Sequence, residues 1–198
     1  MISIFDYGAG NLRSVQNTLS EIGAAYKLID DAGGLREAEK IVLPGVGHFG
    51  QMMRSLDAMR VRGVLLERLK AGVPFLGICL GLQALFRASE EQPELEGLGL
   101  FPEVVRRFAP GARVPHMGWN EIETVHADSP LLRNLGARPH LYFAHSYYAP
   151  MTGSTAAQCT YGVPYTAVLQ KDNIFGVQFH PEKSGPLGLR IVKNFVEL

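Results

Sequence analysis

Short apolar runs alternate with stretches of helical periodicity through the first half of the chain. Residues 2–5 form the first run, which ends before Gly8 and Gly10. Apolar side chains then recur at helical spacing until Gly23, at Leu12, Val15, Leu19 and Ile22. This pattern predicts a strand followed by an amphipathic helix.

The same alternation continues as far as residue 86. Residues 24–29, 40–43 and 74–78 are predicted strands, and a helix after the second of these presents Met52, Met53, Leu56 and Met59 on one face. After the third, Leu82, Leu85 and Phe86 predict another helix. Such alternation implies right-handed crossovers and a mainly parallel sheet with helices on both faces. Sites in such sheets lie at the carboxyl ends of the strands.

The second half is richer in strands. Residues 104–108, 140–149, 156–161 and 165–179 are predicted β-structure, with residues 171–173 as a hairpin turn between the last two strands. Leu187, Ile191, Val192 and Phe195 predict a closing helix. Because no repeat or linker divides the 198 residues, we expect one α/β domain over 1–198, with an antiparallel β portion added in its second half.

Composition removes several classes of function. Lys and Arg together number 19, as do Asp and Glu, and no basic block is interleaved with aromatic residues, which argues against a nucleic-acid surface. The N-terminus has no basic leader and no apolar run is long enough to span a membrane, so we expect a cytoplasmic protein without a membrane partner. Cys79 and Cys159 have no neighbours at metal-ligand spacing, and we expect neither a disulfide framework nor a metal site.

Cys79 stands between two glycines directly after an apolar run, in the sequence GICLG (residues 77–81). This is the thiol version of the nucleophile elbow, in which a sharp strand-to-helix turn exposes the nucleophile. A helix start also favours a thiolate. A small apolar residue in an ordinary turn explains the motif equally well unless a base lies nearby.

His180 and Glu182 supply that base. They follow the apolar run 174–179, at the edge of the sheet where a parallel arrangement also presents Cys79. Two residues apart in extended chain, the carboxylate can accept the imidazole N–H and fix the tautomer that takes a proton from sulfur. Without Cys79, an exposed turn would be the better interpretation of this pair.

The segment Pro44-Gly45-Val46-Gly47 ends the strand 40–43 at the same edge. Glycines on both sides of Val46 allow backbone amides to point inward, where they and the Leu80 N–H can hold a developing oxyanion. The alternative is a tight turn between strand and helix.

Taken together, these motifs resemble the class I, triad-type glutamine amidotransferases, and within them the glutaminase subunits of imidazole glycerol phosphate synthase. The resemblance covers essentially the whole chain. Its motifs are DYGAGNL (6–12), LPGVGHFG (43–50), GICLGLQ (77–83), PHMGWN (115–120) and QFHPEKS (178–184).

The resemblance implies a role for each matching residue. Cys79 would form a glutamyl thioester, His180 would transfer the protons and Glu182 would orient His180. Val46, Leu80 and Gly45 would build the oxyanion hole, and no cofactor is implied. The residues that match the glutamine-binding positions are Gly47, Gln83, Glu91, His145, Ser146 and Tyr147.

The family also implies a partner, because its ammonia passes to a separate (β/α)8-barrel cyclase subunit. Residues matching the surface that faces this subunit are Asn11, Met117, Trp119, Tyr142 and Lys183. Core packing is an equally good interpretation of Trp119, the only tryptophan. Since glycines flank Val46, its peptide plane can rotate, and we expect an oxyanion hole completed only when partner and ligand are bound.

Three other functions remain as alternatives. The glutaminase subunit of pyridoxal phosphate synthase shares the triad chemistry, but PHMGWN and PGVG argue against it. Gln83 and Glu91 argue against a general cysteine hydrolase, because they favour a small amino-acid substrate. A scaffold with a decayed site requires a missing triad residue, and none is missing.

Overall fold

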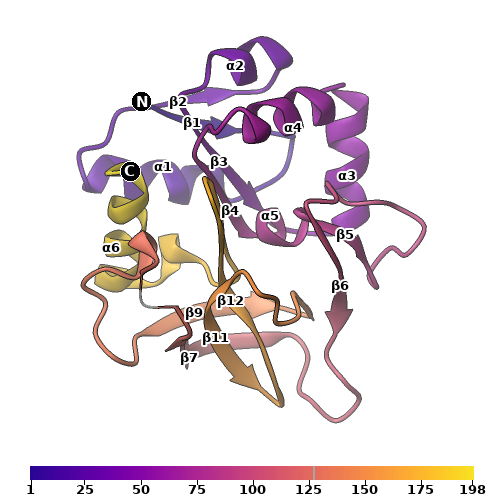
Figure 1. Ribbon diagram of the computed structural model, residues 1–198, viewed down its shortest axis with the longest axis vertical. Helices are drawn as coiled ribbons and strands as arrows, with labels where there is room; N and C mark the ends of the chain where they lie inside the picture. Colours follow the sequence, from indigo (N-terminus) through magenta and orange to yellow (C-terminus); the bar gives the residue numbers. More distant parts are fainter. Residues whose placement is uncertain (127) are drawn as a thin grey trace.

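An eight-stranded sheet forms the centre of the protein, in the order β2-β1-β3-β4-β13-β12-β11-β8 (Figure 1). The computed structural model describes residues 1–126 and 128–198. Strands β2, β1, β3, β4 and β13 are parallel, whereas β12, β11 and β8 are antiparallel to their neighbours. The strand bounds are β1 Ile2–Phe5, β2 Tyr26–Ile29, β3 Lys40–Gly45, β4 Phe75–Cys79, β8 Glu123–Thr124, β11 Thr155–Tyr161, β12 Val163–Lys171 and β13 Ile174–Val177.

Helices cover both faces of this sheet, because its central strands are apolar on both sides. Ile41, Leu43 and Phe75 belong to one buried cluster, with side chains of α2, α3 and α4. The intervening Val42 and Leu76 belong to a second cluster, with side chains of α1 and α6. The helix bounds are α1 Leu12–Glu21, α2 Ala32–Glu37, α3 Phe49–Ala58, α4 Arg62–Lys70 and α6 Gly185–Val196.

Two smaller sheets and three short helical turns complete the fold of the described residues. One sheet has the order β10-β6-β5, and the other pairs β7 with β9 in antiparallel register. Their bounds are β5 Phe86–Ser89, β6 Phe101–Arg107, β7 His116–Glu121, β9 His140–His145 and β10 Tyr147–Tyr148; the turns are α5 Leu80–Gln83, η1 Pro130–Leu132 and η2 Pro181–Lys183.

The predicted parallel sheet with helices on both faces and the added antiparallel portion are confirmed. The hairpin turn predicted at 171–173 is also present, with Asp172 at a φ of 52°. One prediction is wrong: the helix after β4 ends at Gln83, and Phe86 begins strand β5. The carbonyls of Ala84 and Leu85 accept hydrogen bonds from Leu98 and Leu100, so they are not available to a longer helix.

Other boundaries differ for local reasons. The β-structure predicted at 140–149 divides at Ser146, because β9 pairs with β7 whereas β10 pairs with β6. Helices α2 and α4 and strand β7 were not predicted. Helix α4 buries Val64, Leu65 and Leu69.

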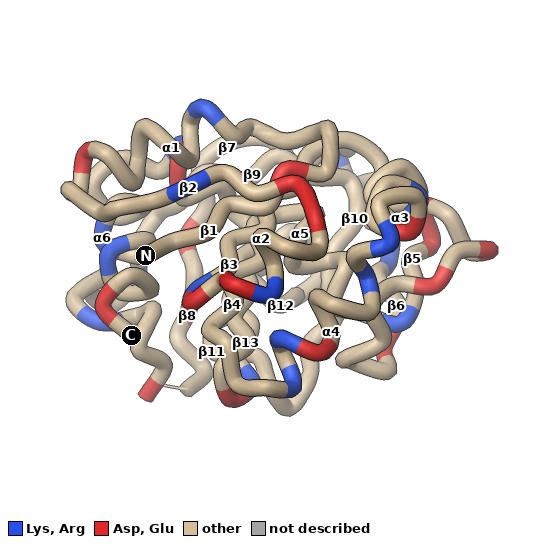
Figure 2. Tube along the Cα trace, turned by 90° about the horizontal axis from the view of Figure 1, so that it is seen from above, with Lys and Arg blue, Asp and Glu red and all other residues tan. Residues whose placement is uncertain are grey.

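Charges of both signs are interspersed along the chain (Figure 2). No helix within residues 1–126 and 128–198 has both the length and the apolar character needed to cross a membrane.

Candidate active site

The turn from β4 into α5 holds Cys79 in a strained conformation. Cys79 has φ 54° and ψ −105°, in the region that side chains other than glycine rarely adopt. A Cβ on Gly81 would lie 2.0 Å from the Leu43 carbonyl oxygen, and one on Gly77 would lie 2.5 Å from the Gly81 carbonyl oxygen. Both positions thus require glycine, because the backbone of the turn passes too near other backbone atoms for a Cβ. The strain at Cys79 favours a nucleophile elbow over ordinary packing.

Strand pairing brings His180, the predicted base, to Cys79, the predicted nucleophile. Strand β13 runs parallel to β4, with Val177 opposite Ile78, so both strands end at one edge. Cys79 and His180 therefore line the same cavity of about 220 Å³. Other predicted residues in its wall are Val46, Gly47, Leu80, Gln83, Glu91, His145, Ser146 and Tyr147. Gly45 packs behind this wall, where an added Cβ would lie 2.7 Å from the Gly81 nitrogen.

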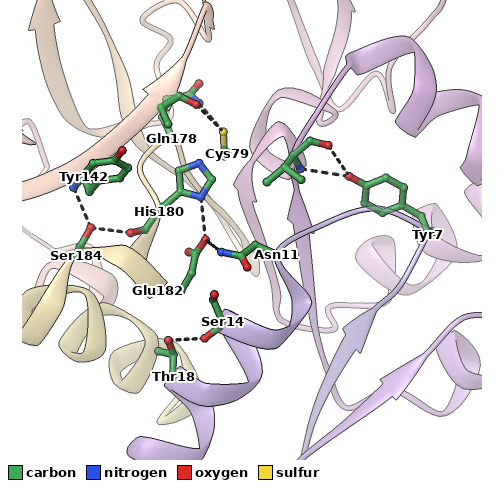
Figure 3. A network of polar contacts seen from close by, with 12 residues as sticks. Tyr7, Asn11, Ser14, Thr18, Cys79, Tyr142, Gln178, His180, Glu182 and Ser184 are labelled. Carbon is green, nitrogen blue, oxygen red and sulfur yellow. Dashed lines mark hydrogen bonds and ion pairs between the residues drawn. The ribbon is translucent and has the colours of Figure 1, made fainter. Parts of the chain in front are cut away.

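His180 and Glu182 form a buried pair, as their spacing predicts. The Nδ1–Oε1 distance is 2.9 Å, and both side chains are almost fully buried. Extended chain was the wrong geometry for this contact: residues after His180 turn through the 3-10 segment η2, which Pro181 begins. The other ring nitrogen faces Cys79 (Figure 3).

The charge on His180 is set by its two partners. Burial lowers the pKa of His180, but hydrogen bonds and charges from Cys79 and Glu182 oppose it and raise this pKa to about 10. The ring is therefore an imidazolium at neutral pH. An adjacent imidazolium is the partner that catalytic thiolates use.

Backbone bonds fix the position of this ring. The His180 N–H donates to the Tyr142 carbonyl at 2.8 Å, which ties the end of β13 to β9. Ser184 Oγ donates to the His180 carbonyl at 2.7 Å and accepts from the Tyr142 N–H at 2.9 Å (Figure 3). Ser184 was not predicted as a site residue, because a serine two residues beyond Glu182 carries no signal without the strand pairing.

A second polar network supports the part of the cavity wall formed by His145 and Tyr147. His145 Nδ1 donates to the Tyr147 carbonyl at 2.8 Å, and Gln83 Nε2 donates to the same oxygen at 2.8 Å. His145 Nε2 lies 3.3 Å from both His116 Nδ1 and Tyr165 Oη. The imidazole of His145 is thus turned into the protein, and only its backbone is available to a ligand.

The five residues predicted to face a partner occupy one region beside the triad. Met117 and Trp119 are 64% and 57% exposed, which excludes core packing for the tryptophan. The Trp119 ring lies 6.1 Å from that of Tyr142, and Lys183 Nζ lies 5.8 Å from the Tyr142 ring centre. Asn11 Nδ2 donates to Glu182 Oε1 at 3.4 Å, which joins this region to the triad.

Comparison with known proteins identifies the family. The sequence model described as Glutamine amidotransferase class-I matches residues 3–198. The chain belongs to this family. Each of two relatives is named imidazole glycerol phosphate synthase subunit HisH. The one from Methanothermobacter thermautotrophicus is 50% identical over 200 residues, covering 100% of this chain and 98% of the relative. The one from Deinococcus radiodurans is 45% identical over 198 residues, covering 98% and 92%.

The fold is that of the glutamine amidotransferases. A solved structure described as a glutamine amidotransferase matches with a TM-score of 0.78, covering 99% of this chain and 97% of that one, at 18% identity. In this amidotransferase chain, no cluster of three or more His, Cys, Asp or Glu side chains suited to a metal ion occurs within the described residues.

Two further side chains of this amidotransferase touch the site and were not predicted. Gln178 Nε2 lies 3.6 Å from Cys79 Sγ. Tyr7 Oη lies 3.3 Å from both the nitrogen and the carbonyl oxygen of Val46. Both residues lie in motifs that carry the family resemblance. For Gln178, the only local sign of a role in the site is a polar side chain at the end of an apolar strand. For Tyr7 there is no local sign.

The buried histidines predict a loss of stability in mild acid. Burial lowers the pKa of His116 to about 4 and that of His145 to about 3. In the unfolded chain each returns to about 6.5, so below that pH the unfolded state binds protons that the native state does not. We therefore expect the urea concentration at the midpoint of unfolding to decrease as the pH is lowered from about 7 to about 5.

His116→Gln tests the source of this slope. The variant should show a weaker fall of the urea midpoint over the same interval, whereas His126→Gln, at an exposed histidine, should keep the wild-type fall. A wild-type midpoint that is constant or rises on acidification would contradict the assignment of two neutral buried rings.

Proposed function

We propose that this chain is the glutaminase subunit of imidazole glycerol phosphate synthase and acts in the cytoplasm as a single domain of residues 1–198. One observation carries the proposal: His180 stands between the buried Glu182 and Cys79 in one cavity. Relatives 45% and 50% identical over nearly their whole length bear the name of this synthase's HisH subunit, which supports it.

The first half-reaction releases ammonia. The Cys79 sulfur attacks the side-chain amide carbon of glutamine, and the carbonyl oxygen takes the negative charge. His180 gives its proton to the amide nitrogen, the C–N bond breaks and ammonia leaves. His180 Nδ1 donates its hydrogen to Glu182 Oε1, with 2.9 Å between nitrogen and oxygen, so the proton given to the substrate comes from Nε2. A glutamyl thioester and a neutral imidazole remain.

The second half-reaction restores the site. His180 accepts a proton from water as the water oxygen attacks the thioester carbon. The C–S bond then breaks, its electron pair returns to Cys79 and glutamate leaves. His180 ends as the imidazolium, which its raised pKa of about 10 favours.

Glutamine fits the cavity through groups that the protein leaves unused. Its volume of about 220 Å³ is small for a ligand site and suits an amino acid. Gln83 donates its two amide hydrogens to the Tyr147 carbonyl and to Gln178 Oε1. Its own side-chain oxygen therefore remains to accept a hydrogen bond from the substrate ammonium. Glu91 Oε2 accepts from the Phe49 N–H at 2.7 Å, which leaves its second oxygen for the same ammonium.

The remaining contacts are made by backbone. Gly47, with a φ of +93°, and the segment from His145 through Ser146 to Tyr147 line the two sides of the cavity. We assign them to the α-carboxylate and the substrate chain, because their backbone amides are donors.

The ammonia is consumed by a (β/α)8-barrel cyclase subunit that docks on the face containing Trp119. The cyclase converts a ribulosyl aminoimidazole carboxamide nucleotide into imidazole glycerol phosphate and aminoimidazole carboxamide ribonucleotide. Trp119 and Met117 are exposed apolar anchors of the kind that form interface hot spots. Asn11 and Lys183 give this face a polar rim close to Glu182.

Glutamate release tests the function. We expect slow release from glutamine by the isolated chain, strong stimulation by the cyclase with its nucleotide, and none from Cys79→Ala. Trp119→Ala should raise the cyclase concentration that gives half-maximal stimulation by about 30-fold or more. Leu28→Ala, at an exposed apolar residue of β2, should leave it unchanged. Equal release from wild type and Cys79→Ala would reject the function.

The oxyanion hole is closed off in the resting enzyme by Tyr7. The Val46 N–H, which would stabilise the oxyanion, donates to Tyr7 Oη at 3.3 Å. Tyr7 is buried, and burial raises its pKa to about 12, so the hydroxyl stays neutral and also donates to the Val46 carbonyl. The peptide that joins Gly45 to Val46 carries this N–H, and its rotation, eased by Gly45, would free the amide to act with the Leu80 N–H in the same cavity wall.

Tyr7→Phe should raise glutaminase activity in the absence of the cyclase. The Val46 N–H loses its acceptor, and one neutral hydrogen bond corresponds to a change of roughly 2- to 10-fold in kcat. Stimulation by the cyclase should shrink by the same factor. Tyr26→Phe, the same substitution on β2, is the matched control, and a Tyr7→Phe variant no faster than it would rule out this restraint.

A further inference from the structure

The side chain of Gln178 is directed at the sulfur of Cys79 from a fully buried position. Gln178 is the first residue after β13, and it is 0% exposed. Its Nε2 lies 3.6 Å from Cys79 Sγ, on a different side of the sulfur from the His180 ring (Figure 3). The catalytic steps described above do not use this amide.

Neighbouring groups fix which end of the amide faces the sulfur. The Tyr147 carbonyl can only accept, so the group of Gln83 at 2.8 Å from it must be the amide nitrogen. That nitrogen lies 3.0 Å from Gln178, which must present its oxygen there. The nitrogen of Gln178 therefore faces Cys79, and the assignment follows from a backbone carbonyl that cannot be reversed.

We propose that Gln178 is a catalytic residue that donates an amide hydrogen bond to the thiolate of Cys79. A buried N–H directed at sulfur favours the charged over the neutral form of that sulfur, because the bond is stronger to an anion. The inference deepens the proposed function and rests on Cys79 being its nucleophile.

The bond has its largest effect when sulfur becomes a leaving group. In the thioester the sulfur carries no charge, so the N–H gains little from it. As water adds to the thioester carbon and the C–S bond breaks, the electron pair returns to sulfur and the Gln178 N–H meets an anion. The donor thus stabilises charge that develops during deacylation, as the oxyanion amides do for oxygen.

Gln178 also has a positioning role through its oxygen, and the two roles are separable. Loss of the Gln83 contact would loosen a substrate-binding side chain and raise KM for glutamine. Loss of the bond to sulfur would change the reactivity of Cys79 when no glutamine is present. Alkylation of the free enzyme therefore reports only on the second role.

Other titratable groups near Cys79 stay constant in such a test. His180 lines the cavity with Cys79 and makes the pair with Glu182. Glu91 and His145 lie in the cavity wall, and Tyr7 is near enough to feel the charge of Cys79. Variants at Gln178 leave all of these side chains in place.

The experiment is the pH profile of Cys79 alkylation by iodoacetamide in the full chain, followed by mass spectrometry of the peptide that contains Cys79. Gln178→Met keeps the length of the side chain and removes the donor. We expect the midpoint of the alkylation profile to move to higher pH by about one unit or more, because a hydrogen bond to an anion is lost. Gln158→Met, two strands away on β11, should match wild type.

A second variant guards against loss of folding. Gln178→Asn keeps a buried amide but is one methylene shorter, so its N–H no longer reaches the sulfur, and the same shift is expected. Wild-type alkylation profiles in both folded variants would overturn the proposal. Cys79→Ala separates this result from the function: glutamate release that survives Cys79→Ala rejects the function itself, whatever the Gln178 profiles show.

Discussion

The parallel pairing of β4 with β13 determines whether a site exists at all. Cys79 and Gln178 are 99 residues apart in sequence, yet the register that places Val177 opposite Ile78 brings the groups following each strand to one edge. Antiparallel pairing here would carry His180 to the opposite edge of the sheet. The buried apolar strands that fix this register therefore also fix the distance between Cys79 and His180.

Charge in the site is arranged around a single cation. His180 lies between Cys79 and Glu182, and its backbone is held by β9 through the Tyr142 carbonyl. Asn11, on the face expected to meet the cyclase, donates to the same carboxylate oxygen that holds His180. This face is thus connected to Glu182 by one hydrogen bond and to His180 by strand β9.

The sequence pattern predicted the features that depend on residues close together in the chain. The alternation of apolar runs and amphipathic stretches predicted the parallel sheet, and the glycines around Cys79 marked a turn that no other residue fits. Tertiary bonds decided the rest. The helix beyond Gln83 is cut short by acceptors used elsewhere in the fold. Gln178 and Tyr7 reach Cys79 and Val46 only because distant segments meet, so spacing along the chain carries no sign of either contact.

The most direct test of this account is the charge on His180, measured by NMR of protein labelled with nitrogen-15 in its histidines. The account predicts that both ring nitrogens of His180 carry hydrogen up to about pH 10, and that Cys79→Ala lowers the pH at which the ring loses its proton. A His180 ring that is neutral at pH 8 in the wild-type enzyme, and whose titration is unchanged by Cys79→Ala, would contradict the arrangement of the triad proposed for this amidotransferase.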